Sequence, residues 1–253
     1  MSSENTETLE QGNIYFLYRP RLGIEEPEDL SDIQRFYMIL SPEGKKRFRI
    51  AVIGRKKLPA PDAGGRERFW GFIETVTGSP NTVKKEMGER NYRTKTRGER
   101  KEPAARPAGE GIYRILSHGN HTHLVYALEL PKKTGEAQEE LGILDQASYI
   151  ISIKNPAKGS PRQTRLSSEQ KAELPQSLQK IFGDRRFADP EPRLLDHPGV
   201  EFLLISAAHD VQDELDITLD TDEETRYSAD IFKELHLEKS GKATKPLFEG
   251  KLV

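Results

Sequence analysis

The feature that most limits what this chain can fold into is a pair of strand-like stretches joined by a two-residue turn. Residues 111–118 (GIYRILSH) and 121–130 (HTHLVYALEL) are rich in β-branched and aromatic residues, and Gly119-Asn120 separates them. Glycine in the first turn position favours a type II′ turn, because glycine adopts a positive φ without steric cost. The sequence therefore predicts an antiparallel β-hairpin with a histidine on each side of its turn.

The two faces of this hairpin differ in chemistry because side chains alternate across a strand. The face expected to point into the core carries Tyr113, Ile115, Leu124, Tyr126 and Leu128. The other face carries three of the six histidines, namely His118, His121 and His123. Such a set could bind one metal ion, so Zn or Fe is a candidate cofactor there. The alternative is a polar hairpin end that happens to be rich in histidine, since no family motif supports the metal site.

Further strands are predicted from apolar stretches of similar length. They lie at residues 13–18, 35–40, 47–54, 69–76, 148–154 and 200–208. Short helices are expected near 82–90 and 132–142 and at 175–182, the last ending at Gly183. Strands and helices alternate too little for a parallel doubly wound sheet. We predict an α+β fold with a mainly antiparallel β-sheet, a barrel or two-layer sandwich, and two or three peripheral helices.

The expected core consists of apolar residues in these strands. They are Phe16, Tyr37, Ile39, Ile50, Val52, Trp70, Phe72, Ile115, Leu124, Tyr126, Ile151 and Leu204. We expect a disordered leader at residues 1–12 and a single strand-rich domain at 13–208. Residues 209–253 are expected to form an acidic linker, a helix and a loose basic tail. That helix would bury one face, formed by Tyr227, Ile231, Phe232 and Leu235.

Composition excludes several classes of protein. The chain has no cysteine, so disulfides, thiol nucleophiles and Cys-ligated metals are excluded. The net charge of −2 provides no overall basic field for nucleic acid, so any polyanion site must be a local patch. The acidic N-terminus is unlike a signal peptide, and no apolar run is long enough to span a bilayer. We therefore expect a soluble cytoplasmic protein.

A basic loop before the hairpin is the first candidate site. It carries six cations, Arg93, Lys95, Arg97, Arg100, Lys101 and Arg106. A second basic cluster comprises Lys45, Lys46, Arg47, Arg49, Arg55, Lys56 and Lys57. Arginine recognises phosphate or carboxylate through two parallel hydrogen bonds, and Tyr92 and Tyr113 could stack on bases. The alternative is that these charged loops are only solvated surface, partly neutralised by Glu99 and Glu102.

An acidic run from Asp210 to Glu224 follows the last predicted strand. It could fold over the basic loop, or it could be a self-repelling linker that leads into a helix begun by a capping box at Thr221 and Glu224. The sequence contains no phosphate-binding loop and no nucleophile elbow.

Three hypotheses of function remain open. The first is a non-catalytic module that binds an anionic partner (RNA, a nucleotide or an acidic protein segment) through the basic loop. The second is a metal-dependent hydrolase or related enzyme that uses the three histidines, so whether the chain is an enzyme stays uncertain. The third is a purely structural or assembly role, in which exposed strand edges or the C-terminal helix mediate contacts.

Overall fold

The computed structural model describes residues 6–94, 98–159, 166–239 and 241–253, with side-chain detail except at 92–94, 98–99 and 168. Its strands are β1 (Thr6–Pro20), β2 (Ile33–Pro42), β3 (Phe48–Ile53), β4 (Arg68–Thr77), β5 (Arg90–Thr94), β6 (Gly98–Glu102), β7 (Arg106–His118), β8 (His121–Leu130), β9 (Gln146–Lys154), β10 (Phe187–Ala188) and β11 (Glu201–Ala208). Its α-helices are α1 (Pro80–Met87), α2 (Glu136–Leu141), α3 (Gln176–Phe182), α4 (Val211–Leu215), α5 (Asp230–Glu234) and α6 (Lys245–Glu249).

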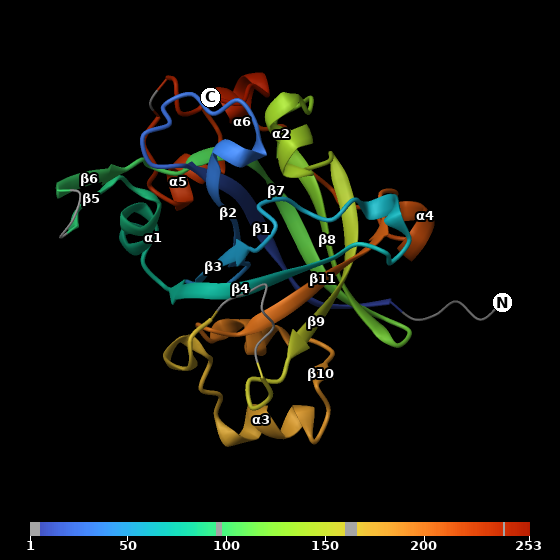
Figure 1. Cartoon of the computed structure of the whole chain (residues 1–253). Coiled ribbons are helices and arrows are strands. Elements are labelled where there is room, and N and C mark those ends of the chain that lie inside the picture. The colour runs from blue at the N-terminus through green and yellow to red at the C-terminus, as the bar shows by residue number, and fades with distance from the viewer. Residues whose placement is uncertain (1–5, 95–97, 160–165, 240) are drawn as a thin grey trace.

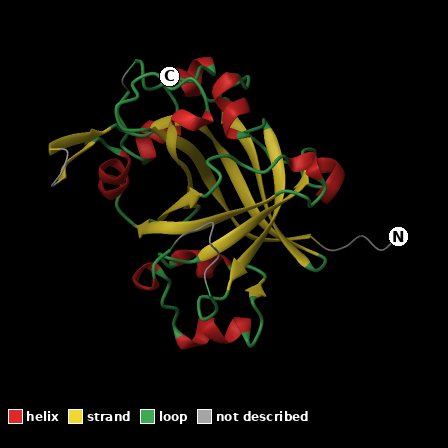
Figure 2. Cartoon of the chain, viewed as in Figure 1, coloured by secondary structure: helices red, strands yellow, loops and turns green. Residues whose placement is uncertain are grey.

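An antiparallel barrel of 8 strands forms the centre of the described chain (Figures 1 and 2). The strands follow one another around it in the order β1-β2-β3-β4-β11-β9-β8-β7, and β7 pairs again with β1. β5 and β6 form a separate two-stranded sheet that projects from the barrel (Figure 1). The α+β prediction, with a mainly antiparallel sheet and peripheral helices, is confirmed, and the barrel is the correct one of its two alternatives.

The predicted hairpin is β7–β8, with the register expected from its turn. His118 pairs with His121 and Leu116 with His123. Gly119 has a φ of 55°, the left-handed conformation for which glycine is suited. The apolar face points into the barrel, where Tyr113 and Ile115 are fully buried. Local turn chemistry and side-chain alternation were therefore sufficient to predict this element.

Both ends of the barrel are closed by other parts of the chain. Residues 155–159 and 166–200, between β9 and β11, lie below the barrel in Figure 1, where Leu194 and Leu195 join the interior cluster. At the other end, Leu141 of α2 and Leu252 join the same cluster. The interior is therefore a packed core.

A second apolar cluster covers the outer face of β1, β2 and β3. Its strand residues are Tyr15, Leu17, Tyr37, Ile39, Ile50 and Val52. The helices α1, α5 and α6 contribute Val83, Met87, Ile231, Phe232, Leu235 and Leu247. Because both faces of these strands are buried, their sequences are nearly continuous apolar runs. Four predicted core residues, Tyr37, Ile39, Ile50 and Val52, are thus buried outside the barrel.

Buried charges close the lower end of the barrel. Arg49, fully buried, binds Glu10 through both carboxylate oxygens, and its Nε donates to Asp196 Oδ1 at 2.7 Å. Lys45 lies 3.1 Å from Glu10, and the hydroxyl of Tyr113 donates to Glu10 at 2.9 Å. Burial acts to raise the pKa of Glu10, but Arg49 outweighs it and holds the pKa below its ordinary value.

The structure differs from the sequence-based prediction at both ends of the chain. β1 begins at Thr6, so residues 6–12 form a strand where a disordered leader was expected, because β7 supplies partners as far as His118. The C-terminal segment contains α6 and is not loose. The amide of Val253 donates to the hydroxyl of Tyr18 at 3.2 Å, and this hydroxyl donates to the Val253 carbonyl at 2.6 Å.

Three aromatic residues also differ from the prediction. Trp70 and Phe72 point away from the barrel and are only half-buried, because the inward positions of β4 are Phe69, Gly71 and Ile73. Tyr227 is 87% exposed, because the last helix predicted by the sequence begins only at Asp230. Residues 221–226 are not helical, so the predicted capping box at Thr221 does not form.

Candidate functional site

A groove of about 770 Å³ lies on the outer face of β1. Five separate segments line it: residues 11–13 of β1, 41–48 around the β2–β3 turn, 78–80 before α1, 112–114 of β7, and parts of 220–236. Its volume is within the range of small-molecule sites. No segment of the chain could have revealed this groove by itself.

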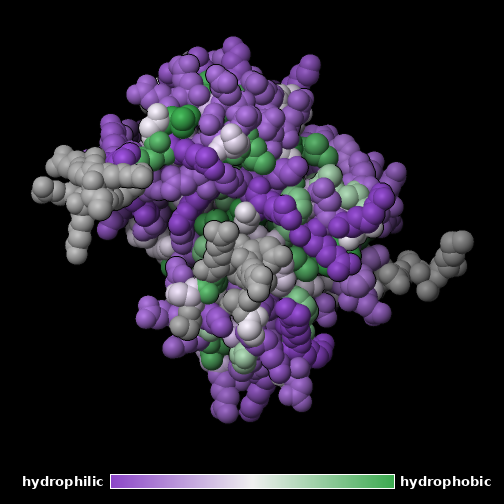
Figure 3. All heavy atoms as spheres, viewed as in Figure 1, coloured by the Kyte–Doolittle hydropathy of each residue, from purple (hydrophilic) through white to green (hydrophobic). Residues whose placement is uncertain are grey.

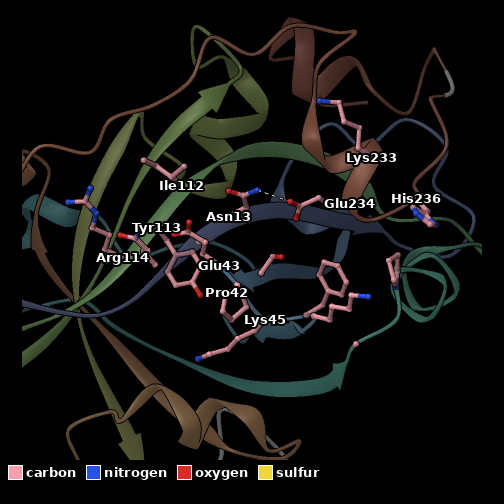
Figure 4. Close-up of a pocket in the computed structure, with 18 of the residues that line it drawn as sticks. Asn13, Pro42, Glu43, Lys45, Ile112, Tyr113, Arg114, Lys233, Glu234 and His236 are labelled. Atoms are coloured by element: carbon pink, nitrogen blue, oxygen red, sulfur yellow. Dashed lines mark hydrogen bonds between the residues drawn. The ribbon is translucent and has the colours of Figure 1, made fainter.

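Charged side chains of both signs line the groove. The cations are Lys45, Lys46, Arg114 and Lys233, and the carboxylates are Glu43, Asp220 and Glu234, with His236 at one end. Lys45 pairs with Glu10 and Lys233 with Asp230. Figure 4 shows Arg114, Lys45 and Lys233 on different sides of the cavity. Arg114 donates to the Thr218 carbonyl at 3.3 Å. Lys46 has no ion-pair or hydrogen-bond partner among the described residues, so its charge is available to a ligand.

The middle of the groove is polar and ordered by hydrogen bonds. Asn13 donates to Glu234 Oε1 at 3.0 Å (Figure 4). The hydroxyl of Tyr15, beneath the groove, donates to Glu234 Oε2 at 2.7 Å. Burial and the neighbouring Glu234 raise the pKa of Tyr15 far above its ordinary value, so the phenol stays protonated. Phe48, Ile112 and Pro42 add apolar wall. The groove thus combines charge, hydrogen-bonding groups and apolar surface.

The second basic cluster of the sequence is divided between the two ends of β3. Lys45 and Lys46 line the groove, whereas Arg47 and Arg49 are engaged with Asp196. Arg55, Lys56 and Lys57 follow β3 at its other end, and the Lys56 amine bonds the Ile33 carbonyl. Only Lys45 and Lys46 of this predicted cluster therefore belong to the groove.

The first basic cluster lies mostly on a β-ribbon made of β5 and β6. The strands pair from Arg90 opposite Glu102 to Thr94 opposite Gly98. Lys95 and Arg97 lie outside the described residues, as does the side chain of Arg93. Lys101 is exposed and pairs with Glu89 at 2.9 Å.

Two residues that were expected to help the ribbon bind a ligand do not lie on it. Arg106 belongs to β7, where it is partly buried and donates to the Glu25 carbonyl at 2.8 Å. Tyr113 is fully buried with its hydroxyl on Glu10, so it cannot stack on a base. The side chain of Tyr92, the other expected stacking residue, lies outside the described residues.

Arg19 anchors the base of the ribbon, which the sequence did not indicate. Its side chain is 1% exposed. It donates to the carbonyls of Glu86 at 2.6 Å and Gly88 at 3.0 Å, at the end of α1, and to that of Pro103, just after β6. A guanidinium has several donors in a fixed plane, so it can tie three main-chain carbonyls from two segments to β1.

The three predicted metal ligands lie at the tip of the β7–β8 hairpin. The rings of His118 and His123 are 5.9 Å apart, whereas His121 is exposed. Burial, followed by the two neighbouring histidines, lowers the pKa of His123 to about 4. Within the described ranges, no three His, Asp or Glu residues are arranged to hold a metal ion. The metal site stays a prediction without geometric support.

A buried polar contact forms beside these histidines. His123 Nδ1 lies 3.0 Å from the hydroxyl of Ser148 and 3.9 Å from Glu214 Oε2. Both Ser148 and His123 are buried beneath α4. This serine is therefore closed off from a substrate.

The acidic run does not fold over the basic ribbon. Val211 and Leu215 of α4 pack on Leu116 and Val125, on the outer face of the β7–β8 hairpin. α4 and the ribbon lie on opposite sides of the molecule in Figure 1. The acidic run was also expected as a flexible linker, but it is packed through these apolar side chains.

Comparisons with known proteins give no relative. A scan against protein-family models, a search of curated proteins and a search of solved structures each found no match. Among the described helices, none has the length and apolar character needed to cross a membrane. The visible face in Figure 3 is largely hydrophilic, with apolar residues only in small groups.

Proposed function

We propose that this protein is a non-catalytic binding module for single-stranded RNA, which occupies the groove and extends toward the ribbon. The observation that carries the proposal is a groove with four cations on its border, one of which, Lys46, is unpaired in the described part of the chain, and with hydrogen-bonding and apolar surface inside, beside three carboxylates. Phosphates would meet Lys45, Lys46 and Arg114, and a base would lie against Phe48 and Ile112. Phosphate contacts supply affinity, whereas apolar contacts with bases tolerate different sequences.

Helix α1 supports a continuous path from the groove to the ribbon. Pro80, its first residue, lines the groove, and its last residue, Met87, is followed closely by β5. An eight-residue helix is about 12 Å long, the span of a few nucleotides. Lys84 and Lys85 are exposed on this helix. The ribbon's cations would then neutralise phosphates beyond the groove.

RNA binding is expected to depend on both the groove and the ribbon. We would titrate a labelled oligouridine of about twelve nucleotides and follow its fluorescence anisotropy at several salt concentrations. Lys46→Ala with Arg114→Ala should weaken binding roughly tenfold or more at low salt. The salt slope, which is the slope of log affinity against log salt concentration, should become smaller by about 1.4, because two phosphate contacts are lost. Arg100→Ala with Lys101→Ala should have a similar effect.

The matched control replaces two exposed cations of the 155–200 segment, Lys180→Ala with Arg193→Ala, which should leave the affinity within about twofold. If all four groove and ribbon cations can be removed without changing affinity or salt slope, the proposal is wrong. If uridine monophosphate competes as well as the oligonucleotide, the groove is a nucleotide site and the ribbon has no part in it.

A further inference from the structure

Residues 216–235 cross the outer face of the barrel as a strap that forms one wall of the groove. The strap runs from the end of α4 to the end of α5, which lie on opposite sides of the barrel in Figure 1. Asp220, Lys233 and Glu234 of the strap all line the groove. The shape of the groove therefore depends on whether the strap is attached.

The strap is attached partly through apolar side chains. Ala229, Ile231 and Leu235 are fully buried in the cluster that covers the outer face of β1–β3. Its first half is held less firmly, since Ile217 and Leu219 are only partly buried. Polar contacts with the barrel also hold the strap, along the stretch between its partly buried first half and its buried end.

Several polar contacts join the strap to the barrel. Asn13 and Tyr15 donate to Glu234, and Arg114 donates to the Thr218 carbonyl.

Two glutamates of the barrel also accept hydrogen bonds from amides of the strap. Glu110 of β7, 1% exposed, accepts hydrogen bonds from the amides of Ile231 at 2.8 Å and Asp230 at 3.3 Å. Glu129 of β8 accepts one from the amide of Asp222 at 2.8 Å. Both glutamates bind the strap through its main chain.

The side chains around these glutamates are predominantly acidic. The groups that interact electrostatically with Glu110 or Glu129 are Tyr15 from β1, Asp222 and Glu224 from the strap, and Asp230 and Lys233 from α5. Lys233, the single cation of this set, is exposed and pairs with Asp230 at 3.1 Å. The barrel and the strap thus present like charges to each other.

Glu224 of the strap adds to this repulsion through a buried carboxylate oxygen. Its side chain is 8% exposed, and its Oε2 is buried without a hydrogen-bond partner among the described residues. An ionised carboxylate oxygen without a partner is costly in such a place. The charge of Glu224 also acts on Glu110, so the repulsion between strap and barrel falls when Glu110 is neutral.

The proton affinities agree with this geometry. Burial raises the pKa of Glu110 to about 8. The amides of Ile231 and Asp230 act to lower it, but burial and the charges of Glu224 and Asp230 outweigh them. Burial also raises the pKa of Glu129, again with a contribution from Glu224. Near neutral pH the carboxyl group of Glu110 is therefore mostly protonated while the strap is closed.

We propose that the strap is a pH-sensitive latch on the groove, closed while the carboxyl group of Glu110 carries a proton and opening when that proton is lost. What the latch controls, the binding of RNA, rests on the proposed function. The latch itself rests on the burial of Glu110 under the strap, on the acidic side chains around it and on the strap amides that bind it. Opening would remove one wall of the groove, with Asp220, Lys233 and Glu234 on it. Binding would weaken because the enclosure is lost, not because of these charges, two of which are acidic.

The direction and size of the effect follow from proton linkage. In the open strap Glu110 is solvated and regains its ordinary pKa of 4.5, whereas in the closed strap the pKa is about 8. Between these values opening releases one proton, so the opening constant rises about tenfold per pH unit. From pH 6 to pH 9 it should rise about a hundredfold, with most of the rise below pH 8.

Hydrogen exchange measured by mass spectrometry tests the latch. Protection factors, corrected for the intrinsic pH dependence of exchange, are compared between pH 6 and pH 9 in the full-length protein. In the wild type, peptides from 216–235 should lose protection as the pH rises while peptides from β2 and β3 keep theirs. Glu110→Gln should abolish most of this loss, because glutamine is neutral and retains an accepting oxygen.

Two further variants keep the test decisive. Glu224→Gln should also reduce the pH dependence, and it serves if Glu110→Gln does not fold. Glu173→Gln, at an exposed site in the 155–200 segment, should behave like the wild type. If the protection of the strap in the wild type is independent of pH, or if Glu110→Gln and Glu224→Gln retain the full dependence, the latch is wrong.

The same samples separate this proposal from the proposed function. If oligouridine fails to bind at any pH but the strap opens with the expected pH dependence, the RNA proposal fails and the latch stands. If oligouridine binds and its affinity does not fall as the wild-type strap opens, the latch does not control the groove and the proposal is overturned.

Discussion

Arg49→Met is expected to lower the free energy of unfolding by about 3 kcal/mol or more, because it leaves buried carboxylates without their main partner. Arg49 is fully buried, binds both oxygens of Glu10, and reaches Asp196 through Nε. Methionine fills a similar volume, so most of the loss comes from charge and not from a cavity. Lys45 and Tyr113 still contact Glu10 in the variant, which holds the loss near the lower end of the usual range.

The effect of Arg49→Met should shrink as the solution is acidified. In the wild type the pKa of Glu10 lies below 4.5, so its contribution to stability is fully present above pH 4.5 and is lost as the pH falls through the folded pKa. Without Arg49, burial raises the pKa of Glu10, and protonation at low pH removes the unpaired charge. Guanidinium denaturation at pH 7 and pH 4 measures the difference.

Arg193→Met is the matched control, because Arg193 forms an exposed ion pair with Glu191 in the turn that also supplies Asp196. It should change stability by less than about 0.5 kcal/mol. Equal effects of the two substitutions would show that the buried charges do not hold this end of the barrel.

Arg19→Met should detach the base of the β5–β6 ribbon and destabilise the protein by about 3 kcal/mol. Three main-chain carbonyls, of Glu86, Gly88 and Pro103, would lose a charged donor in a buried place. We expect hydrogen exchange to accelerate most in residues 86–104, and the ribbon's contribution to RNA binding to fall. Arg19→Lys should restore part of the protection, since an ammonium group can still donate to some of these carbonyls.

Arg21→Met provides the comparison for Arg19, because Arg21 is an exposed arginine two residues further along the chain. It should leave the protection of residues 86–104 unchanged. If Arg19→Met lowered protection evenly across the barrel and the ribbon, Arg19 would be a general stabilising residue and not an anchor for the ribbon.

Local features of the fold could be predicted from sequence because their causes are local. The β7–β8 hairpin follows from Gly119 and side-chain alternation, and α3 ends at Gly183 as expected. Features set by distant partners could not be predicted. β1 extends back to Thr6 only because β7 lies beside it. Trp70 points out of the core because its neighbour Gly71 points inward, where it faces Phe202.

The candidate site was even less accessible to sequence analysis. Lys45 and Lys46 gave a signal as part of a basic run, but Arg114, Lys233 and Glu234 come from segments with no common pattern. Charge counting also treated all arginines alike. Arg19 and Arg49 are internal supports of the structure, and only burial and hydrogen bonding distinguish them from Arg100 at the surface.

The closed barrel has a consequence for how this chain folds as it is synthesised. β1 begins at Thr6 and pairs with β7, so that Thr6 lies opposite His118. In the same way Arg68 of β4 lies opposite Ile205 of β11. Contacts between residues so distant in sequence slow folding, because long loops must close before the contacts form. The barrel cannot close until most of the protein has left the ribosome. The partly made chain must therefore expose apolar strands such as β2 and β3, and chaperones that recognise such strands should bind it before closure.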